Sequence, residues 1–146
     1  MIEEGDKVFF CYAGLPSVTG DYGSIAWRAI ENLGLIPIVY GNATLDIEKS
    51  NLAKEILKDF HESEAIVVLL FGKKQRRENS SVGDNWAIPK LPAAISQGTN
   101  CLVCATAEVT KNEIKSLKLP VDVVTVKDEG QFETILRQYL EKAMAA

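Results

Sequence analysis

Five short runs of apolar and β-branched residues alternate along the chain with five helix-like segments of mixed polarity. The central run, AIVVLLF at 65–71, has no polar residue, as expected of a strand that is buried on both faces of a sheet. The periodicity predicts strands at 7–13, 35–40, 65–71, 101–106 and 121–126, and helices at 24–34, 50–63, 88–97, 110–117 and 131–145.

Regular alternation of strands and helices predicts a parallel sheet that is covered by helices on both faces. Right-handed crossovers narrow this to a doubly wound, flavodoxin-like α/β fold with strand order 2-1-3-4-5. Pro37 suits an edge strand, because proline cannot donate a ladder hydrogen bond, and Gly34 suits the residue that closes the preceding helix.

Length and composition set the broad class of the chain. Its 146 residues are expected to form a single domain over 1–146, and the final helical pattern lacks a clear stop signal, which leaves room for further domains in a longer protein. The net charge of -4 gives no general case for nucleic acid, and the longest apolar run, seven residues, is too short to span a membrane. An acidic N-terminus and three cysteines favour a reducing, cytoplasmic location.

Ligands of such sheets gather at the carboxyl ends of the strands, near the switch in strand order. Glycines 14, 20 and 23 follow the first strand and lead into a helix N-terminus, which favours a phosphate or carboxylate; the alternative is three ordinary turn glycines. The loop at 72–85 carries Lys73, Lys74, Arg76 and Arg77. That loop is either a lid that pairs with a diphosphate or a solvated basic segment.

Cysteine and histidine give no metal site in this sequence. Cys101 and Cys104 form a C-x-x-C pattern, but residues three apart in a strand point to opposite faces and cannot share a metal or a disulfide. Cys11 lies in the first strand and is expected in the core. His61 is the only histidine, and a position near a helix C-terminus is enough to explain it.

The strand and helix motifs resemble those of Toll/interleukin-1 receptor (TIR) domains over residues 7–126. The first strand, VFFCYA at 8–13, has Cys11 where these domains commonly have serine, and LIPIVY and AIVVLLF follow in the family's order. TIR domains typically read S-x-W-C-x-x-E-L at the start of the later helix, and this chain reads DNWAIPKL at 84–91. The TIR-like domains of bacterial and archaeal signalling proteins look closest. AISQG at 94–98 is also similar to nucleoside deoxyribosyltransferases.

The resemblance implies a nucleotide-binding domain, with NAD as substrate or ligand and a role in immune-defence signalling. Both families cleave an N-glycosidic bond with a glutamate that stabilises positive charge on the ribose or attacks it. Lys90 falls on that position, and an ammonium can do neither. The resemblance places Tyr12, Ala13 and Gly14 against the ligand, Trp86 as a stacking platform and position 90 at the chemical step. Trp86 is equally interpretable as a packing residue at the helix start.

Three interpretations of Lys90 stay open at this point. The chain is a natural pseudoenzyme, an altered form of an active NAD nucleosidase (Glu and Lys codons differ by one base), or an enzyme whose working carboxylate lies elsewhere. Asp84 is the best substitute carboxylate, followed by Glu78, Asp46 and Asp21. The rival function is a non-catalytic adaptor that acts by TIR–TIR self-association, and a weaker one is a deoxyribosyltransferase-like enzyme.

Overall fold

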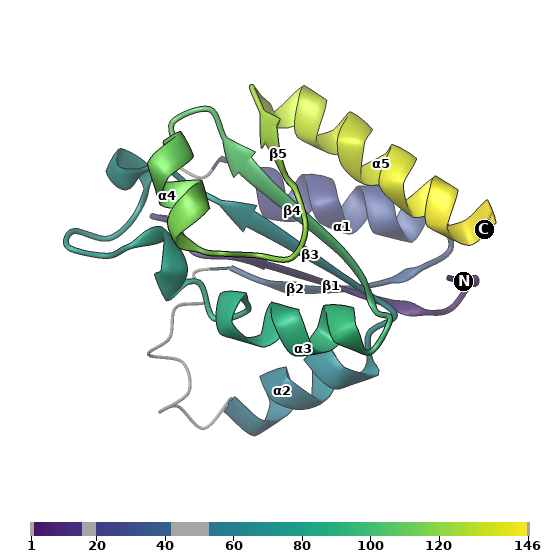
Figure 1. Ribbon diagram of the computed structural model, residues 1–146. Coiled ribbons are helices and arrows are strands. Elements are labelled where there is room, and N and C mark those ends of the chain that lie inside the picture. Colours follow the sequence, from purple (N-terminus) through teal and green to yellow (C-terminus); the bar gives the residue numbers. More distant parts are fainter. Residues whose placement is uncertain (1, 16–19, 42–52, 146) are drawn as a thin grey trace.

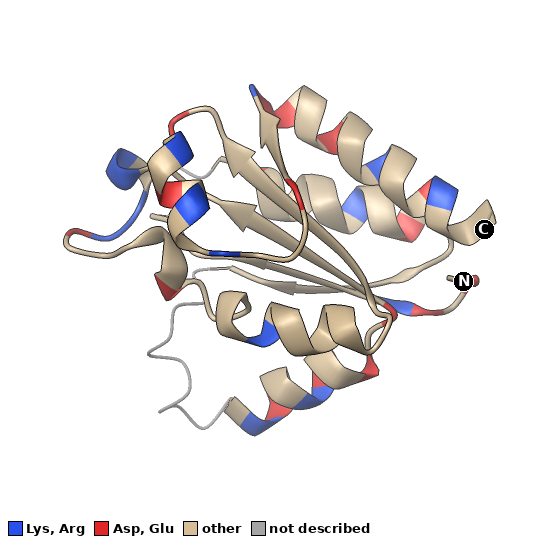
Figure 2. Ribbon diagram, in the orientation of Figure 1, with Lys and Arg blue, Asp and Glu red and all other residues tan. Residues whose placement is uncertain are grey.

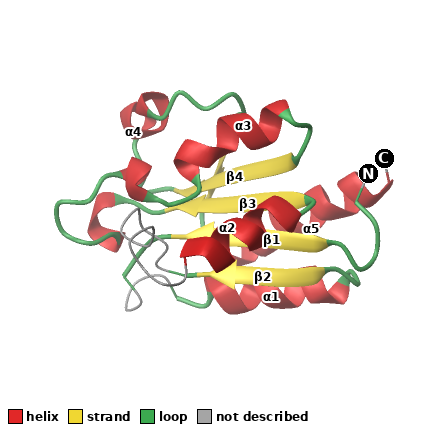
Figure 3. Cartoon of the chain, turned by 90° about the horizontal axis from the view of Figure 1, so that it is seen from below, coloured by secondary structure: helices red, strands yellow, loops and turns green. Residues whose placement is uncertain are grey.

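The computed structural model describes residues 2–15, 20–41 and 53–145, which form a five-stranded parallel sheet between two layers of helices (Figure 1). The strands are β1 (Lys7–Tyr12), β2 (Ile36–Tyr40), β3 (Ala65–Leu70), β4 (Asn100–Thr106) and β5 (Val123–Val126). The helices are α1 (Tyr22–Asn32), α2 (Ala53–Glu62), α3 (Leu91–Ser96), α4 (Lys111–Ser116) and α5 (Glu129–Ala145). The order β2-β1-β3-β4-β5 confirms the predicted flavodoxin-like, doubly wound fold, and Figure 3 shows β2, β1, β3 and β4 side by side in that order.

Two hydrophobic cores lie on opposite faces of the sheet, and strand periodicity separates them. Val8 and Phe10 of β1 join the core under α1 and α5, whereas Phe9 and Cys11 join the core under α2, α3 and α4. All six residues of β3 are buried, since this central strand is covered on both faces. Figure 1 shows α1 and α5 together on one side of the sheet and α2 and α3 on the other.

Local sequence signals set several boundaries of the elements. Gly34 has φ +78°, the left-handed conformation that ends α1, and Pro37 lies on β2, an edge strand of the sheet; both agree with the prediction. Thr110 caps α4 by accepting a hydrogen bond from the Glu113 N–H at 3.1 Å, and the Glu113 carboxylate accepts one from the Thr110 N–H.

The structure differs from several predicted boundaries. The helix expected at 24–34 is α1 at Tyr22–Asn32, and the strand expected at 121–126 is β5 at Val123–Val126. The helix expected at 88–97 begins as a 3-10 turn at Ile88–Lys90 before α3. The final helix starts at Glu129 instead of 131, because the Asp128 carboxylate accepts a hydrogen bond from the Gln131 N–H at 2.8 Å. The polar loop at 72–85 contains 3-10 turns at 73–75 and 82–84. Among the helices of the described residues, none has both the length and the apolarity needed to cross a membrane.

Candidate functional site

The switch in strand order falls between β1 and β3, and the segments that follow these two strands meet there. Ala13 and Gly14, directly after β1, line a small hollow with residues of the 72–85 loop. The loop residues that line it are Arg76, Arg77, Ser80, Ser81 and Asp84. The structure therefore brings together Ala13, Gly14 and Asp84, three of the residues predicted for the site. The hollow holds only about 10 Å³, close to the space of one water molecule.

Arg76 fastens the 72–85 loop to the body of the domain instead of facing solvent. Its side chain is 8% exposed and donates from Nη1 to the Phe71 carbonyl at 2.7 Å and from Nη2 to the Glu113 carboxylate at 3.0 Å. Gln75 adds a second attachment, because its Oε1 accepts hydrogen bonds from the Gly72 N–H and the Thr106 hydroxyl, both at 2.9 Å. The loop is thus neither a fully solvated segment nor a lid with four available cations.

The remaining basic residues of that loop stay at the surface. Lys73, Lys74 and Arg77 are exposed. Figure 2 shows the basic segment at the carboxyl end of the sheet, next to the mixed charges of α4. Arg77 is the exposed cation that lines the hollow with Ala13 and Gly14.

Asp84 holds the shape of its own turn. Its Oδ2 accepts a hydrogen bond from the Ser81 N–H at 2.9 Å, and its Oδ1 accepts one from the Ser81 hydroxyl at 3.2 Å. This is the arrangement of a capping carboxylate, the ordinary alternative for this residue. Of the other candidate acids, Glu78 and Asp21 are exposed, and Asp46 lies outside the described residues.

Trp86 is a core residue in this structure, with an exposure of 1%. Its ring packs edge-on against Phe60, with centroids 5.5 Å apart, and at an angle to Phe9 at 5.9 Å. The Lys90 Nζ lies 4.0 Å from the centroid of the indole ring. A flat ligand would reach the Trp86 face only if the Lys90 side chain moved away, and the contacts support the packing interpretation.

Asn85 positions the start of the segment that carries Trp86. Its Oδ1 accepts hydrogen bonds from the Ala87 N–H at 2.9 Å and from the Cys11 thiol at 3.4 Å, which ties this turn to β1. Burial raises the pKa of Cys11 to about 12, so the thiol stays protonated and able to donate. Asn85 Nδ2 and Trp86 Nε1 are buried without a hydrogen-bond partner in the described part of the chain.

Tyr12 points to the other face of the sheet from Trp86 and Lys90. Its ring contacts Phe10 and Phe71, with centroids 5.3 and 6.0 Å away, and it joins the core under α1 and α5. Burial raises the pKa of Tyr12. The structure thus separates the Tyr12 side chain from position 90, although both belong to the predicted site.

Gly20, just before α1, and Gly23, in its first turn, have packing roles. Gly20 has φ +60° and lies against the Glu129 carboxylate, and Gly23 faces the Tyr12 hydroxyl, where a Cβ would lie only 2.8 Å away. Glu129 Oε1 also accepts a hydrogen bond from the Asp21 N–H at 3.4 Å. A carboxylate of the chain itself therefore lies at the N-terminus of α1, where a phosphate or carboxylate of a ligand was the predicted occupant.

Cysteine and histidine lie as the sequence predicts. Cys104 belongs to the core under α1 and α5, while Cys101 packs against the opposite core, so the two side chains cannot share a ligand. His61 is in the last turn of α2. Within 2–15, 20–41 and 53–145, no three His, Cys, Asp or Glu side chains gather closely enough to hold a metal ion.

Comparisons with known proteins assign no family to the chain. Neither a scan against protein-family models nor a search of curated proteins gave a match for the chain.

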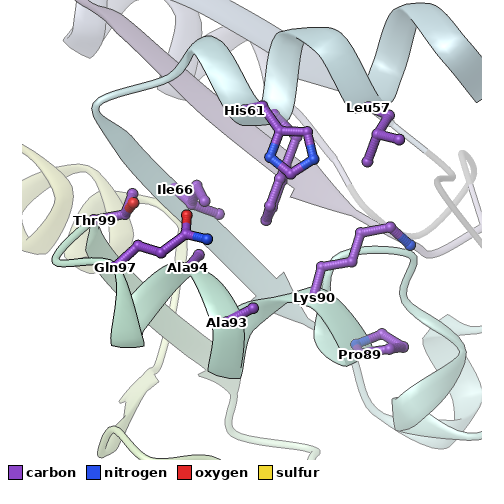
Figure 4. A pocket seen from close by; sticks show the side chains of 10 residues that line it. Leu57, His61, Ile66, Pro89, Lys90, Ala93, Ala94, Gln97 and Thr99 are labelled. Atoms are coloured by element: carbon purple, nitrogen blue, oxygen red, sulfur yellow. The ribbon is translucent and has the colours of Figure 1, made fainter.

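Sequence reasoning missed a hollow of about 270 Å³ between α2 and α3, with Lys90 on its rim (Figure 4). The sequence carries no signal for it, because Leu57 falls on one apolar helical face with Ile56 and Phe60, and its exposure of 39% is apparent only in the structure. The pairing of Arg76 with Glu113 was missed as well, since nothing local in the sequence joins residues so far apart.

Proposed function

We propose that the chain is a TIR-like domain that binds NAD or a related nucleotide at the carboxyl ends of β1 and β3, without cleaving its N-glycosidic bond. The proposal rests on the resemblance of 7–126 to TIR domains and on the flavodoxin-like sheet, whose ligands bind at the switch in strand order. Ala13 and Gly14 lie at that switch, with Arg77, Ser80 and Ser81 opposite them. Arg77 is the group that offers a positive charge to a diphosphate, because the Ser80 and Ser81 hydroxyls already donate to the Arg77 carbonyl and the Asp84 carboxylate.

The charge at position 90 is the observation that supports binding without cleavage. The Lys90 ammonium lies over the Trp86 ring, where the related enzymes would have a carboxylate. Lys90 also lines two hollows, and neither of them is lined by an Asp or Glu side chain among the described residues. A fixed positive charge there opposes the positive charge that develops on ribose as the glycosidic bond breaks.

Calorimetric titration of the chain with NAD tests the binding part of this proposal. We expect saturable binding, and we expect Arg77→Gln to weaken it about tenfold, because one charge-assisted contact to phosphate is lost. Lys74→Gln is the matched control, because Lys74 is exposed on the same loop but does not line the hollow. Equal affinity of the two variants would contradict the proposed location.

Self-association is the second candidate function, and the β2 edge favours it. Trp27 of α1 is 46% exposed and Ile36 of β2 is 43% exposed. Trp27 also lines an open hollow with Val39, so it lies beside this edge strand. Two results together would favour an adaptor function over nucleotide binding. Calorimetry would detect no heat on addition of NAD, and the chain would form concentration-dependent dimers that Trp27→Asp abolishes.

A further inference from the structure

The hollow between α2 and α3 shares Lys90 with the proposed nucleotide site, but its other lining residues lie away from Ala13 and Gly14. Its lining includes Ile66, the second residue of β3, and Thr99, which directly precedes β4. These positions mark the amino ends of the strands, whereas Ala13 and Gly14 follow the carboxyl end of β1. A volume of about 270 Å³ lies just below the range of typical small-molecule pockets, so the fitting ligand is small.

The walls of this hollow are apolar. Leu57 and Phe60 contribute from α2, and Ala93 and Ala94 from α3. Leu57 is 39% exposed although it is a large aliphatic residue, so a ligand seated here would remove apolar surface from water. The alanines of α3 leave the space that larger side chains would fill.

The polar groups on the rim carry positive charge or hydrogen-bond donors. Figure 4 shows Lys90 and Gln97 at the two ends of α3, with His61 of α2 facing the groove. No Asp or Glu side chain of the described residues lines this hollow. A neighbouring hollow shares Leu57 and Lys90 and adds Lys54, which increases the positive charge at the Lys90 end.

Contact with an aromatic ring keeps the Lys90 cation at this rim. The Lys90 Nζ lies 4.0 Å from the Trp86 centroid, and the buried indole is itself fixed by Phe9 and Phe60. An ammonium is a cation with three N–H donors, which favours an anion in the hollow.

We propose that the α2–α3 hollow binds a small monocarboxylate with an apolar body. The carboxylate pairs with Lys90, and the body lies along Leu57, Phe60 and Ala94. Lys90 and Gln97 are seven residues apart, about 10 Å along a helix, which suits a medium-length acid. Among the described residues, Lys90 is the one lysine in the lining of this hollow, since Lys54 lines only its neighbour. This favours one negative charge, whereas a phosphate dianion needs several cations or N–H donors.

An NMR titration of backbone amides with sodium octanoate tests this proposal. We expect saturable shifts confined to α2, α3 and the start of β4, with no comparable shifts for octylamine, which has the opposite charge. Lys90→Met keeps the length of the side chain and is expected to weaken octanoate binding about tenfold, as the loss of one ion pair predicts. Lys58→Met is the matched control, because Lys58 is exposed on α2 outside the lining.

A blocking variant separates this site from the nucleotide site. Ala93→Phe is expected to fill the hollow and abolish octanoate binding while NAD binding is retained, since Ala93 does not line the hollow at Ala13 and Gly14. Octanol binding as tightly as octanoate, unchanged affinity in Lys90→Met, or shifts outside α2 and α3 would each overturn the proposal. Absence of NAD binding to wild type, with octanoate binding intact, would overturn only the nucleotide proposal.

Discussion

Trp86→Ala is expected to lower the free energy of unfolding by about 3–5 kcal/mol, the usual cost of removing a large buried aromatic side chain. Trp86 is 1% exposed and contacts the rings of Phe9 and Phe60, so alanine would leave a cavity in the middle of the core under α2 and α3. Urea denaturation followed by far-ultraviolet circular dichroism measures the change, because that signal does not depend on the tryptophan.

The second tryptophan of the chain is the control for this experiment. Trp27 is 46% exposed, and Trp27→Ala is expected to change stability by less than about 1 kcal/mol. If the two variants had equal stability, Trp86 would not be the packing residue that the structure shows. Such a result would return it to the role of a ligand-stacking platform.

Arg76→Met is expected to destabilise the domain by about 2–3 kcal/mol, because it removes charge-assisted hydrogen bonds at a mostly buried position. The Phe71 carbonyl would lose its donor at 2.7 Å, and the Glu113 carboxylate would lose its partner at 3.0 Å. Chemical denaturation at neutral pH measures this loss. Arg137→Met is the control, since Arg137 is 46% exposed and forms only surface pairs on α5; its effect is expected below about 0.5 kcal/mol per pair.

The pH dependence of the Arg76 effect identifies Glu113 as the partner. Desolvation would raise the Glu113 pKa, but the Thr110 N–H and Arg76 together outweigh it and hold the pKa below its ordinary value of 4.5. A lowered carboxyl pKa contributes stability that is present above pH 4.5 and is lost as the pH falls through the folded value. The difference between wild type and Arg76→Met should therefore shrink in acid, and a constant difference would contradict the pairing.

The fold was predictable because its signals are local and repeat along the chain. The unbroken apolar run of β3, the glycine that ends α1 and the proline of the edge strand β2 each restrict one element, and together they allow few topologies. The opposite directions of Cys101 and Cys104 followed from strand geometry alone.

The candidate site was predictable only in part, because side-chain direction and long-range pairing decide it. Ala13, Gly14 and Asp84 meet as expected of segments that follow adjacent parallel strands. Tyr12 points away because it lies two residues after Phe10 in β1 and therefore on the same face of the strand. The alternation of side chains along a strand already implies this direction. The burial of Arg76 depends on Glu113 in α4, and the α2–α3 hollow depends on how two helices pack; neither has a local signature.

Release of nicotinamide from NAD tests most directly whether the charge at position 90 separates binding from cleavage. Wild type, Lys90→Met and Lys90→Glu are incubated with NAD under identical conditions, and nicotinamide is measured by chromatography. We expect no release by wild type or Lys90→Met and measurable release by Lys90→Glu, which would place a carboxylate at the ribose. Release by wild type, or the absence of release by Lys90→Glu when NAD binding is intact, would contradict it.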